Sequence, residues 1–389
     1  MKLSKITALV LTIAMCLGLL AGCAGGGSNY TANNTEFIIG LSGPLTGAAA
    51  MYGNAVANGA QMAVDEINAA GGINGIKFKL VVTNDENDAT KIATNYTSML
   101  EAGMQVSLGT VTSKPGLEFS NLSAEDNVFF LTPSASADDI PAKANGYQMC
   151  FADGNQGQVA ADYVNANFAG QTIGVFYKSD EPYSNGIYQQ FSAHLDKSVT
   201  VVKTSFTDAN TTDFATQIDT LKNCGFIFMP IYYTPASLFM QQAKDIMNPS
   251  AVYYGCDGFD GIDNIKGFDI TAIPQEVTML SHFNSKATEG PAKEFIDKYL
   301  AKYSSDTLNQ FGASAYDCVY AIYGAMKKAV AGGAKIPVTI SASDLCNILK
   351  AQFEGGFSMD GAVTGQHIAW EKSGYVNKIA IKYIIKEAD

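Results

Sequence analysis

The sequence predicts an α/β protein made of two similar lobes, each built on a mostly parallel, doubly wound sheet. After residue 36, short apolar segments alternate with amphipathic segments of helical period. The apolar segments show no polar alternation, as expected of parallel strands that helices cover on both faces. This rhythm runs twice, with a break near residues 153–155, and the two runs predict the two lobes.

The first run contains four strand-like segments separated by helical ones. Glycines at 71–72 and at 103 mark two helix ends, and Asn87 or Asp88 is a candidate helix cap. The predicted strands are 37–41, 78–82, 106–108 and 128–131, and the predicted helices are 53–70, 88–101 and 115–124.

The second run repeats the pattern and ends differently. Its predicted strands are 172–177, 199–204, 226–231 and 251–254, and its predicted helices are 158–168, 185–195, 214–221 and 236–247. Two long helical segments follow, at 291–303 and 312–331. The last two apolar segments, 365–370 and 376–385, predict a hairpin that turns at Lys372-Ser373-Gly374.

The N-terminus predicts export. Two lysines precede an apolar run that is shorter than the ~20 residues of a membrane span, which is typical of a signal peptide, here residues 1–22. Leu20-Ala21-Gly22-Cys23 is similar to the bacterial lipobox, so Cys23 is a predicted lipidation site. An ordinary signal peptide with an incidental cysteine is the alternative. Residues 23–35 have the composition of a flexible tether, so the mature protein is expected outside the cytoplasm, on a membrane lipid anchor.

Composition excludes several function classes. A net charge of −12 argues against a nucleic-acid surface, which needs clustered positive charge. The three histidines are isolated, so neither a metal nor a cofactor is expected. Without a nucleophile that has a base in reach, no enzyme and no catalytic residue is predicted. Five cysteines remain after Cys23, with no C-x-x-C pair, and buried free thiols are the simplest interpretation.

All 25 basic residues are lysines, so no guanidinium group is available to hold a carboxylate. An anion must then be held by backbone N–H groups, hydroxyls, helix N-termini or lysine. Ligands bind beyond the carboxyl ends of strands in open α/β sheets, and there the first lobe supplies hydroxyls. The second lobe supplies acids and tyrosines instead, which suit an ammonium group and an apolar side chain. These segments are 42–47, 51–53, 109–113 and 132–136 in the first lobe, and 180–183, 232–233 and 255–258 in the second.

The chain resembles the leucine/isoleucine/valine-binding protein family, the type I periplasmic receptors of branched-chain amino acid ABC importers. The resemblance covers the mature chain and rests on the order and spacing of several motifs rather than on one of them. These are Ile39-Gly40-Leu41-Ser42-Gly43-Pro44, Tyr52-Gly53, Gly59-Ala60, Ile67-Asn68, Gly71-Gly72-Ile73-Asn74-Gly75, Thr132-Pro133-Ser134-Ala135-Ser136, Tyr183-Ser184-Asn185-Gly186 and Tyr232-Tyr233-Thr234-Pro235.

The resemblance implies roles for eight residues. Thr110, Ser134, Ala135 and Ser136 would hold the ligand carboxylate and part of its ammonium group. Asp257 stands where the family usually has a glutamate on the ammonium group, and its shorter side chain implies a changed ligand pose, a changed closure or a bridging water. Tyr52 and Tyr183 would wall the side-chain pocket, and Tyr233 would close over the ligand.

The resemblance also implies the domain organisation and the partners. Lobe 1 would comprise residues 36–152 and 281–360, and lobe 2 residues 153–280 and 361–389, joined by a hinge. We expect a monomer that captures a small amino acid, most simply an aliphatic one, and delivers it to an ABC permease. The alternatives are a receptor of the same fold for an amide, urea or an aromatic acid, and a sensory binding protein.

Overall fold

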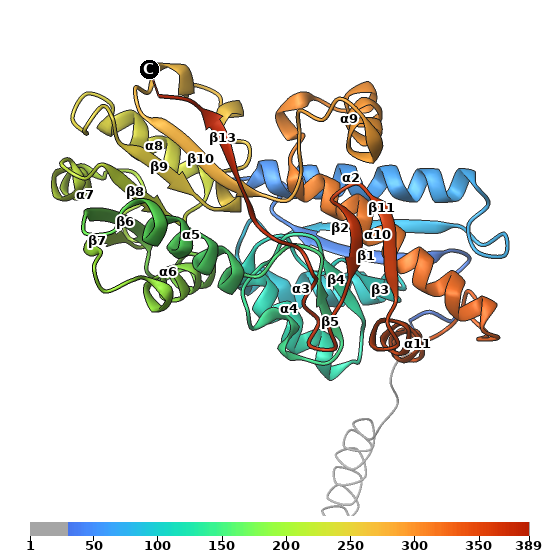
Figure 1. The fold of residues 1–389 in the computed structure, drawn as a ribbon. Coiled ribbons are helices and arrows are strands. Elements are labelled where there is room, and N and C mark those ends of the chain that lie inside the picture. Colours follow the sequence, from blue (N-terminus) through green and yellow to red (C-terminus); the bar gives the residue numbers. More distant parts are fainter. Residues whose placement is uncertain (1–29, 389) are drawn as a thin grey trace, which may run out of the picture.

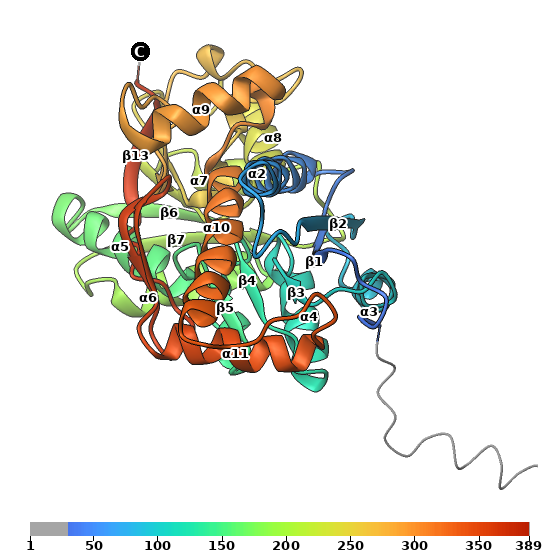
Figure 2. The same ribbon diagram turned by 90° about the vertical axis from the view of Figure 1, so that its right-hand side faces the viewer.

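The computed structural model describes residues 30–388. The predicted signal peptide, the lipid site at Cys23 and most of the predicted tether lie outside the described residues. Two sheets with helices on their faces form two lobes that lie side by side (Figure 1). Seen after a turn of 90°, the helices surround the sheets (Figure 2). The predicted α/β class with two parallel-sheet lobes is confirmed.

The first lobe is built on a parallel sheet of order β2-β1-β3-β4-β5. All seven residues of β1 are buried, because this strand is flanked by neighbours and covered on both faces. Its elements are β1 (Phe37–Gly43), α2 (Ala50–Ala69), β2 (Phe78–Asn84), α3 (Ile92–Glu101), β3 (Val106–Ser107), α4 (Ser113–Glu125), β4 (Phe130–Thr132) and β5 (Gly146–Gln148).

The second lobe is built on a sheet of order β13-β10-β9-β8-β6-β7. The pairs are parallel except β10–β13, which is antiparallel. Its elements are α5 (Asp153–Asn167), β6 (Thr172–Lys178), α6 (Pro182–His194), β7 (Thr200–Phe206), α7 (Ala215–Leu221), β8 (Phe226–Met229), α8 (Tyr233–Ala243), β9 (Val252–Gly255), β10 (Glu276–Ser281) and β13 (Ile381–Lys386).

The segment between β10 and β13 returns to the first lobe. It contains α9 (Gly290–Lys302), α10 (Gln310–Ala331), α11 (Ala342–Glu354), β11 (Ser358–Ala362) and β12 (Gly365–Ala369). Helix α10 packs closely along α2, and a Cβ atom on Gly59 would come within 2.0 Å of the Gly312 carbonyl oxygen. Glycine at residue 59 therefore sets how closely the two helices approach.

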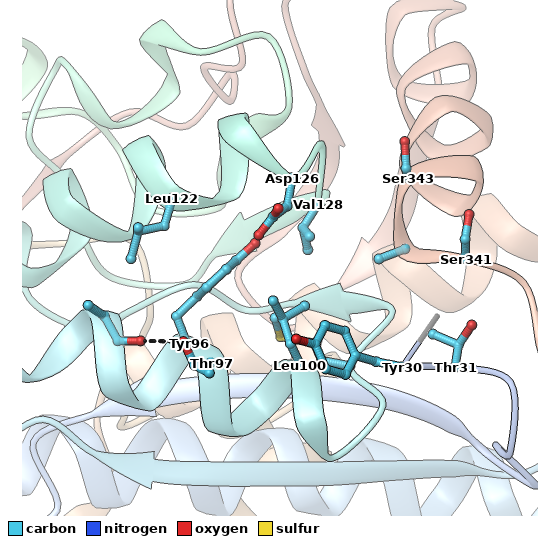
Figure 3. Close-up of a pocket in the computed structure, with 13 residues that line it drawn as sticks. Tyr30, Thr31, Tyr96, Thr97, Leu100, Leu122, Asp126, Val128, Ser341 and Ser343 are labelled. Carbon is cyan, nitrogen blue, oxygen red and sulfur yellow. Dashed lines mark hydrogen bonds between the residues drawn. The ribbon is translucent and has the colours of Figure 1, made fainter. Parts of the chain in front are cut away.

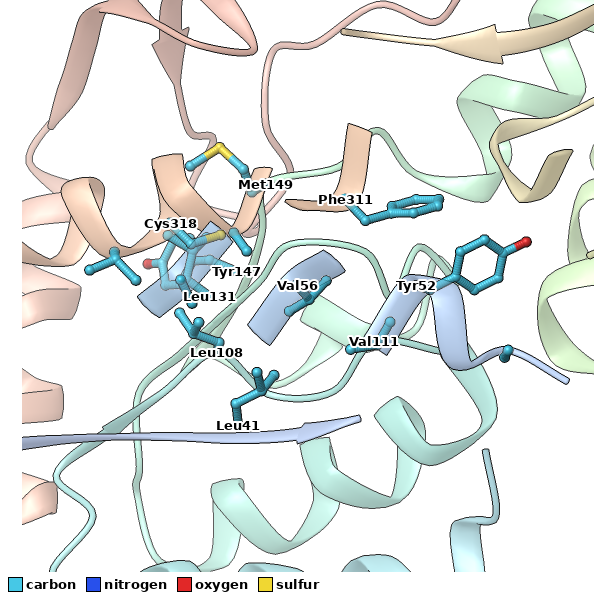
Figure 4. Packing of buried hydrophobic residues seen from close by; sticks show 14 of the residues in the cluster. Leu41, Tyr52, Val56, Leu108, Val111, Leu131, Tyr147, Met149, Phe311 and Cys318 are labelled. Atoms are coloured by element: carbon cyan, nitrogen blue, oxygen red, sulfur yellow. The ribbon is translucent and has the colours of Figure 1, made fainter. Parts of the chain in front are cut away.

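The largest apolar core continues from the first-lobe sheet to the edge between the lobes. Leu41 in β1, Leu131 in β4 and Leu108, which follows β3, pack against α2 and α10, and Tyr52 and Phe311 lie at the end of this cluster (Figure 4). The core thus ends in two aromatic side chains at the place where the lobes meet.

The predicted C-terminal hairpin is wrong, because its two strands pair with other strands and not with each other. The turn exists, because Gly374 has φ 88° and its N–H donates to the Glu371 oxygen at 3.0 Å. Beyond a single bridge between Trp370 and Val376, however, the two strands separate. Strand β12 pairs with β11, and β13 pairs with β10, about 100 residues earlier. Strand pairing across such a distance leaves no local signal in the sequence.

The chain passes between the lobes after β5, after β10 and before β13. The boundaries at residues 153, 281 and 361 stay a prediction. We propose that the third crossing lies near residue 376, because the Trp370 indole donates to the Gln148 carbonyl oxygen at 2.8 Å. The Gln148 N–H also donates to the Gly374 oxygen at 2.9 Å, so the turn stays with the first lobe.

The described residues also bear on two expectations about cysteines and membranes. The five cysteines after Cys23 are free and buried. Between residues 30 and 388, no helix has both the length and the apolar character needed to cross a membrane.

Candidate functional site

The loops that follow the strands of both lobes meet around one small cavity. In this closed form its volume is about 10 Å³, which is room for about one water molecule. The lining residues are Tyr52, Val111, Thr112, Ser113, Ser134, Ser136, Phe311, Tyr183, Tyr232, Asp257 and Gly258. The first seven belong to the first lobe and the last four to the second, so the cavity lies at the carboxyl ends of both sheets, where ligands bind in such folds.

Of the eight predicted residues, five line this cavity: Tyr52, Ser134, Ser136, Tyr183 and Asp257. Thr110, Ala135 and Tyr233 do not line it. Gly109 has φ 63°, a conformation that favours glycine, and the chain turns there. The Thr110 hydroxyl then donates to the Thr112 carbonyl oxygen at 3.2 Å, inside the first lobe.

The first-lobe wall is largely satisfied by its own hydrogen bonds. The N–H groups of Ser134 and Ala135 donate to the Thr132 hydroxyl at 3.3 and 3.0 Å. The Ser136 N–H donates to the Ser113 hydroxyl at 3.2 Å. Thr112 precedes α4, and its buried hydroxyl has no hydrogen-bond partner. This hydroxyl and the N-terminus of α4 are therefore open to an anion.

The second-lobe wall centres on a buried carboxylate. The Tyr183 hydroxyl donates to Asp257 Oδ1 at 2.7 Å and accepts the Gly258 N–H at 2.9 Å. The Asp257 N–H donates to Gln156 Oε1 at 2.9 Å. Burial raises the pKa of Asp257 to about 6, while the bond from Tyr183 favours its charged form.

Sequence reasoning missed a second carboxylate beside Asp257. Asp153 begins α5 and is buried, and neither of its oxygens accepts a hydrogen bond of normal geometry. Burial raises its pKa well above the usual range; the Ser136 hydroxyl opposes this shift and the Asp257 charge adds to it. A buried acid without a partner costs free energy unless a cation satisfies it.

From the sequence, Asp153 was only part of the break between the two α/β runs, near residues 153–155. It does not line the cavity, and its position at a lobe crossing was the available signal for a carboxylate near the cleft.

Four aromatic rings form the remaining wall. The Tyr52 ring lies edge-on to Phe311 at 5.0 Å and to Tyr232 at 5.6 Å between centroids, and Tyr183 stacks on Tyr232 at 4.8 Å. Tyr232 and Phe311 were not predicted as site residues. Tyr232 adjoins Tyr233 after a strand, whereas Phe311 comes from a distant helix that only the fold brings to the cleft.

Hydrogen bonds across the cleft hold the lobes closed. The Tyr52 hydroxyl donates to the Gly258 oxygen at 2.5 Å and accepts the Tyr233 N–H at 3.3 Å. The Met51 N–H donates to the Tyr233 hydroxyl at 3.2 Å. Tyr233 thus bridges the lobes beside the cavity instead of lining it.

A larger cavity lies away from the cleft and carries no functional argument. It measures about 530 Å³ and lies between α3, α4 and the start of α11, with Tyr96, Leu100 and Leu122 among its walls (Figure 3). It is not at the carboxyl ends of the strands. Among the described residues, no group of three His, Cys, Asp or Glu side chains is arranged to hold a metal ion.

Comparison with known proteins gives consistent matches over most of the chain. A family model described as periplasmic binding protein matches residues 36–344. The chain is 27% identical over 299 residues to Leu/Ile/Val-binding protein homolog 3 of Brucella melitensis, covering 76% of this chain and 79% of that protein. It is 28% identical over 315 residues to the leucine-, isoleucine-, valine-, threonine-, and alanine-binding protein of Pseudomonas aeruginosa, covering 78% and 81%.

Solved structures agree with these matches. LivJ from Streptococcus pneumoniae, a branched-chain amino acid transporter substrate binding protein solved in complex with isoleucine, superposes with a TM-score of 0.76 at 25% identity, covering 91% of this chain and 96% of that one. A solute binding protein from R. palustris in complex with 4-hydroxybenzoate has the same TM-score at 13% identity, covering 91% and 94%, which shows a shared fold alone.

Proposed function

Because the chain belongs to the periplasmic binding protein family, we propose that it captures a small amino acid between its lobes for an ABC importer. A branched-chain or other aliphatic amino acid fits the named relatives, and delivery to a membrane permease follows from their role. The observation that carries the proposal is the division of the closed cavity into a hydroxyl wall and an acid wall. Such a division complements a molecule with a carboxylate at one end and an ammonium group at the other.

We assign the carboxylate of the ligand to the first lobe. Thr112 and Ser134 would donate hydroxyl hydrogen bonds, aided by the N-terminus of α4. Ser136 lines the cavity too, with its hydroxyl near Asp153. Thr110 and Ala135 would support this wall from behind, Thr110 through its bond to the Thr112 carbonyl oxygen.

We assign the ammonium group to Asp257 and Asp153 together. One carboxylate, Asp257, is held in place by Tyr183, and the other, Asp153, lacks a partner. A second acid from α5 supplies additional negative charge near the ammonium group. It would therefore compensate for the shorter side chain of Asp257, which stands where the family usually has a glutamate. The ligand side chain would then contact Tyr52, Tyr183, Tyr232 and Phe311.

We further propose that the mature protein works as a monomer outside the cytoplasm, held to the membrane by lipid on Cys23. The sequence Leu20-Ala21-Gly22-Cys23 and the tether composition of residues 23–35 support this anchor. Metabolic labelling with a radioactive or clickable fatty acid tests it: the wild-type protein should be labelled, and the Cys23→Ser variant should not.

A thermal-shift screen of the twenty amino acids, selected amides, urea and benzoates tests the ligand class. A ligand that binds the folded state raises the apparent melting temperature by mass action. We expect leucine, isoleucine, valine or alanine to give the largest shift. A benzoate or an uncharged amide in first place would contradict the proposal, because such a ligand leaves both aspartates without a cation.

A further inference from the structure

The cleft cavity in this closed form is smaller than the ligand proposed for it. It has room for about one water molecule, and even glycine is several times larger than water. Its aromatic wall cannot simply turn aside, because the buried ring of Tyr52 packs edge-on against Phe311 and Tyr233, with centroids 5.0 and 4.7 Å apart. An amino acid therefore needs the two lobes to lie further apart than they do here.

Four neighbouring hydrogen bonds join the lobes beside this cavity. Three of them are the bonds across the cleft that involve the side chains of Tyr52 and Tyr233. In the fourth, the Thr234 hydroxyl, at the start of α8, donates to the Ala48 carbonyl oxygen, just before α2, at 2.7 Å. We call these four bonds, between residues 48–52 of the first lobe and residues 233–234 and 258 of the second, the latch.

The lobes are in close contact at the latch. A Cβ atom on Gly261, in the second lobe, would come within 2.9 Å of Met51 Cε, in the first. A further contact across the cleft, between Lys114 Nζ on α4 and Asp208 Oδ2, spans 3.6 Å and joins two solvent-exposed charges, which stabilise little. The latch is therefore the stronger of these two contacts between the lobes.

The latch and the cavity share two residues, one from each lobe. Tyr52 and Gly258 both line the cavity, and the Tyr52 hydroxyl donates to the Gly258 oxygen at 2.5 Å. Moving the two walls apart by more than about 1 Å would carry this bond beyond hydrogen-bond range. Room for an amino acid requires a larger movement, because the ligand extends over several atoms. The intact latch and a bound amino acid therefore exclude each other.

We propose that the latch is an autoinhibitory contact: it stabilises a closed form that excludes the amino acid and competes with its binding. Tyr233 and Thr234 are positioning residues in this scheme, since neither lines the cavity and both set the affinity without touching the ligand. The inference rests on the proposed function only for the identity of the ligand.

The sign of the effect follows from the competition between two forms. The apparent affinity falls in proportion to the fraction of molecules that can accept the ligand. A weaker latch leaves more molecules in an accepting form, so the loss of a latch hydrogen bond tightens binding. Bonds between the lobes that stabilise the ligand-bound form would give the opposite sign, because their loss weakens binding.

Two single substitutions each remove one hydroxyl of the latch. Thr234→Val and Tyr233→Phe should each bind L-leucine about twofold to tenfold more tightly than the wild type, the fold-change that corresponds to one neutral hydrogen bond. Isothermal titration calorimetry measures the affinities. Thr220→Val is the matched control, because the Thr220 hydroxyl donates to the Thr216 oxygen within α7 at 2.8 Å. Unchanged or weaker binding in both latch variants overturns the proposal.

Distances between spin labels test the latch without relying on affinity. Cysteines at the exposed residues Thr46 and Gln241 would carry the labels, one shortly before Ala48 and the other further along α8 from Thr234. We expect a short distance in the wild type without ligand, a longer one after L-leucine is added, and a longer one in ligand-free Thr234→Val. A distance that shortens on addition of L-leucine, or a ligand-free wild type that lacks the short distance, overturns the proposal.

Failure of the proposed function would give a different result. If L-leucine binds neither the wild type nor the variants, while the ligand-free distance is short in the wild type and longer in Thr234→Val, the assignment of the ligand is wrong and the latch is supported.

Discussion

The two walls of the cleft differ in how many of their polar groups have hydrogen-bond partners in the absence of a ligand. In the first lobe, Thr132 and Ser113 already accept the N–H groups of residues 134–136, and little beyond the Thr112 hydroxyl is left over. In the second, Asp257 is buried with a raised pKa, and Asp153 next to it has no partner. The hydroxyl wall is thus part of the folded framework, whereas the acid wall stores unfavourable free energy that a cation would relieve.

Of the substitutions in the two walls, we expect one at Asp257 in the acid wall to weaken ligand binding most. Asp257→Asn should weaken L-leucine binding by about 1.5–3 kcal/mol, the value of a hydrogen bond to a charged group, because the neutral amide attracts an ammonium group less. Isothermal titration calorimetry measures the change. Asp263→Asn, an exposed acid six residues later, is the control, and equal affinities for the two variants would remove Asp257 from the site.

Asp153→Asn should separate stability from binding. Removing an unpartnered buried carboxylate should raise the melting temperature of the ligand-free protein by about 2–4 °C per kcal/mol relieved. The same change should weaken L-leucine binding by about 1–2 kcal/mol, since one charge of the pair is lost. A variant that is less stable and binds normally would show that Asp153 serves the fold instead.

The acid wall also predicts how stability depends on pH. Burial raises the pKa of Asp257 to about 6 and that of Glu181, at the start of α6, to about 7. A raised pKa means that the folded state holds protons that the unfolded state has lost. Stability of the ligand-free protein should therefore fall as pH rises from about 4 to about 7, by about 3 kcal/mol for each group, and the melting temperature should decrease by roughly 10–20 °C. Scanning calorimetry should show this slope reduced in Asp257→Asn.

The smallest effect is expected on the hydroxyl wall, from two neighbouring threonines. Thr112→Val should weaken L-leucine binding by about 1 kcal/mol, less than a full hydrogen bond to a charged group, because Ser134 and the N-terminus of α4 still hold the carboxylate. Thr110→Val is the matched control, because its hydroxyl bonds within the first lobe. Calorimetry that finds a larger loss for Thr110→Val would reverse the assignment of the two residues.

Much of the cleft could be predicted from the sequence, because the carboxyl ends of the strands in a parallel sheet meet at one edge. The apolar strands and their following loops place Tyr52, Ser134, Ser136, Tyr183 and Asp257 around one cavity, as the resemblance implied. The missing arginine also pointed to hydroxyls and helix N-termini as the only local means, apart from lysine, of holding an anion.

The direction in which each side chain points could not be predicted from the sequence. The left-handed turn at Gly109 carries Thr110 into the first lobe and leaves Thr112 at the cavity. Strands β5 and β10 and helix α11 were also missed: β5 is three residues long and carries no pattern, and β10 follows a stretch of irregular turns.

The sequence by itself determined the two α/β runs, the order of their elements and the chemical character of each wall, because periodicity and composition are local properties. The tertiary structure alone decided that β13 returns to β10, that Phe311 reaches the cleft, and that Asp153 is buried without a hydrogen-bond partner. Those features depend on which distant segments pack together, and the free energy of a buried charge exists only once that packing has removed it from water.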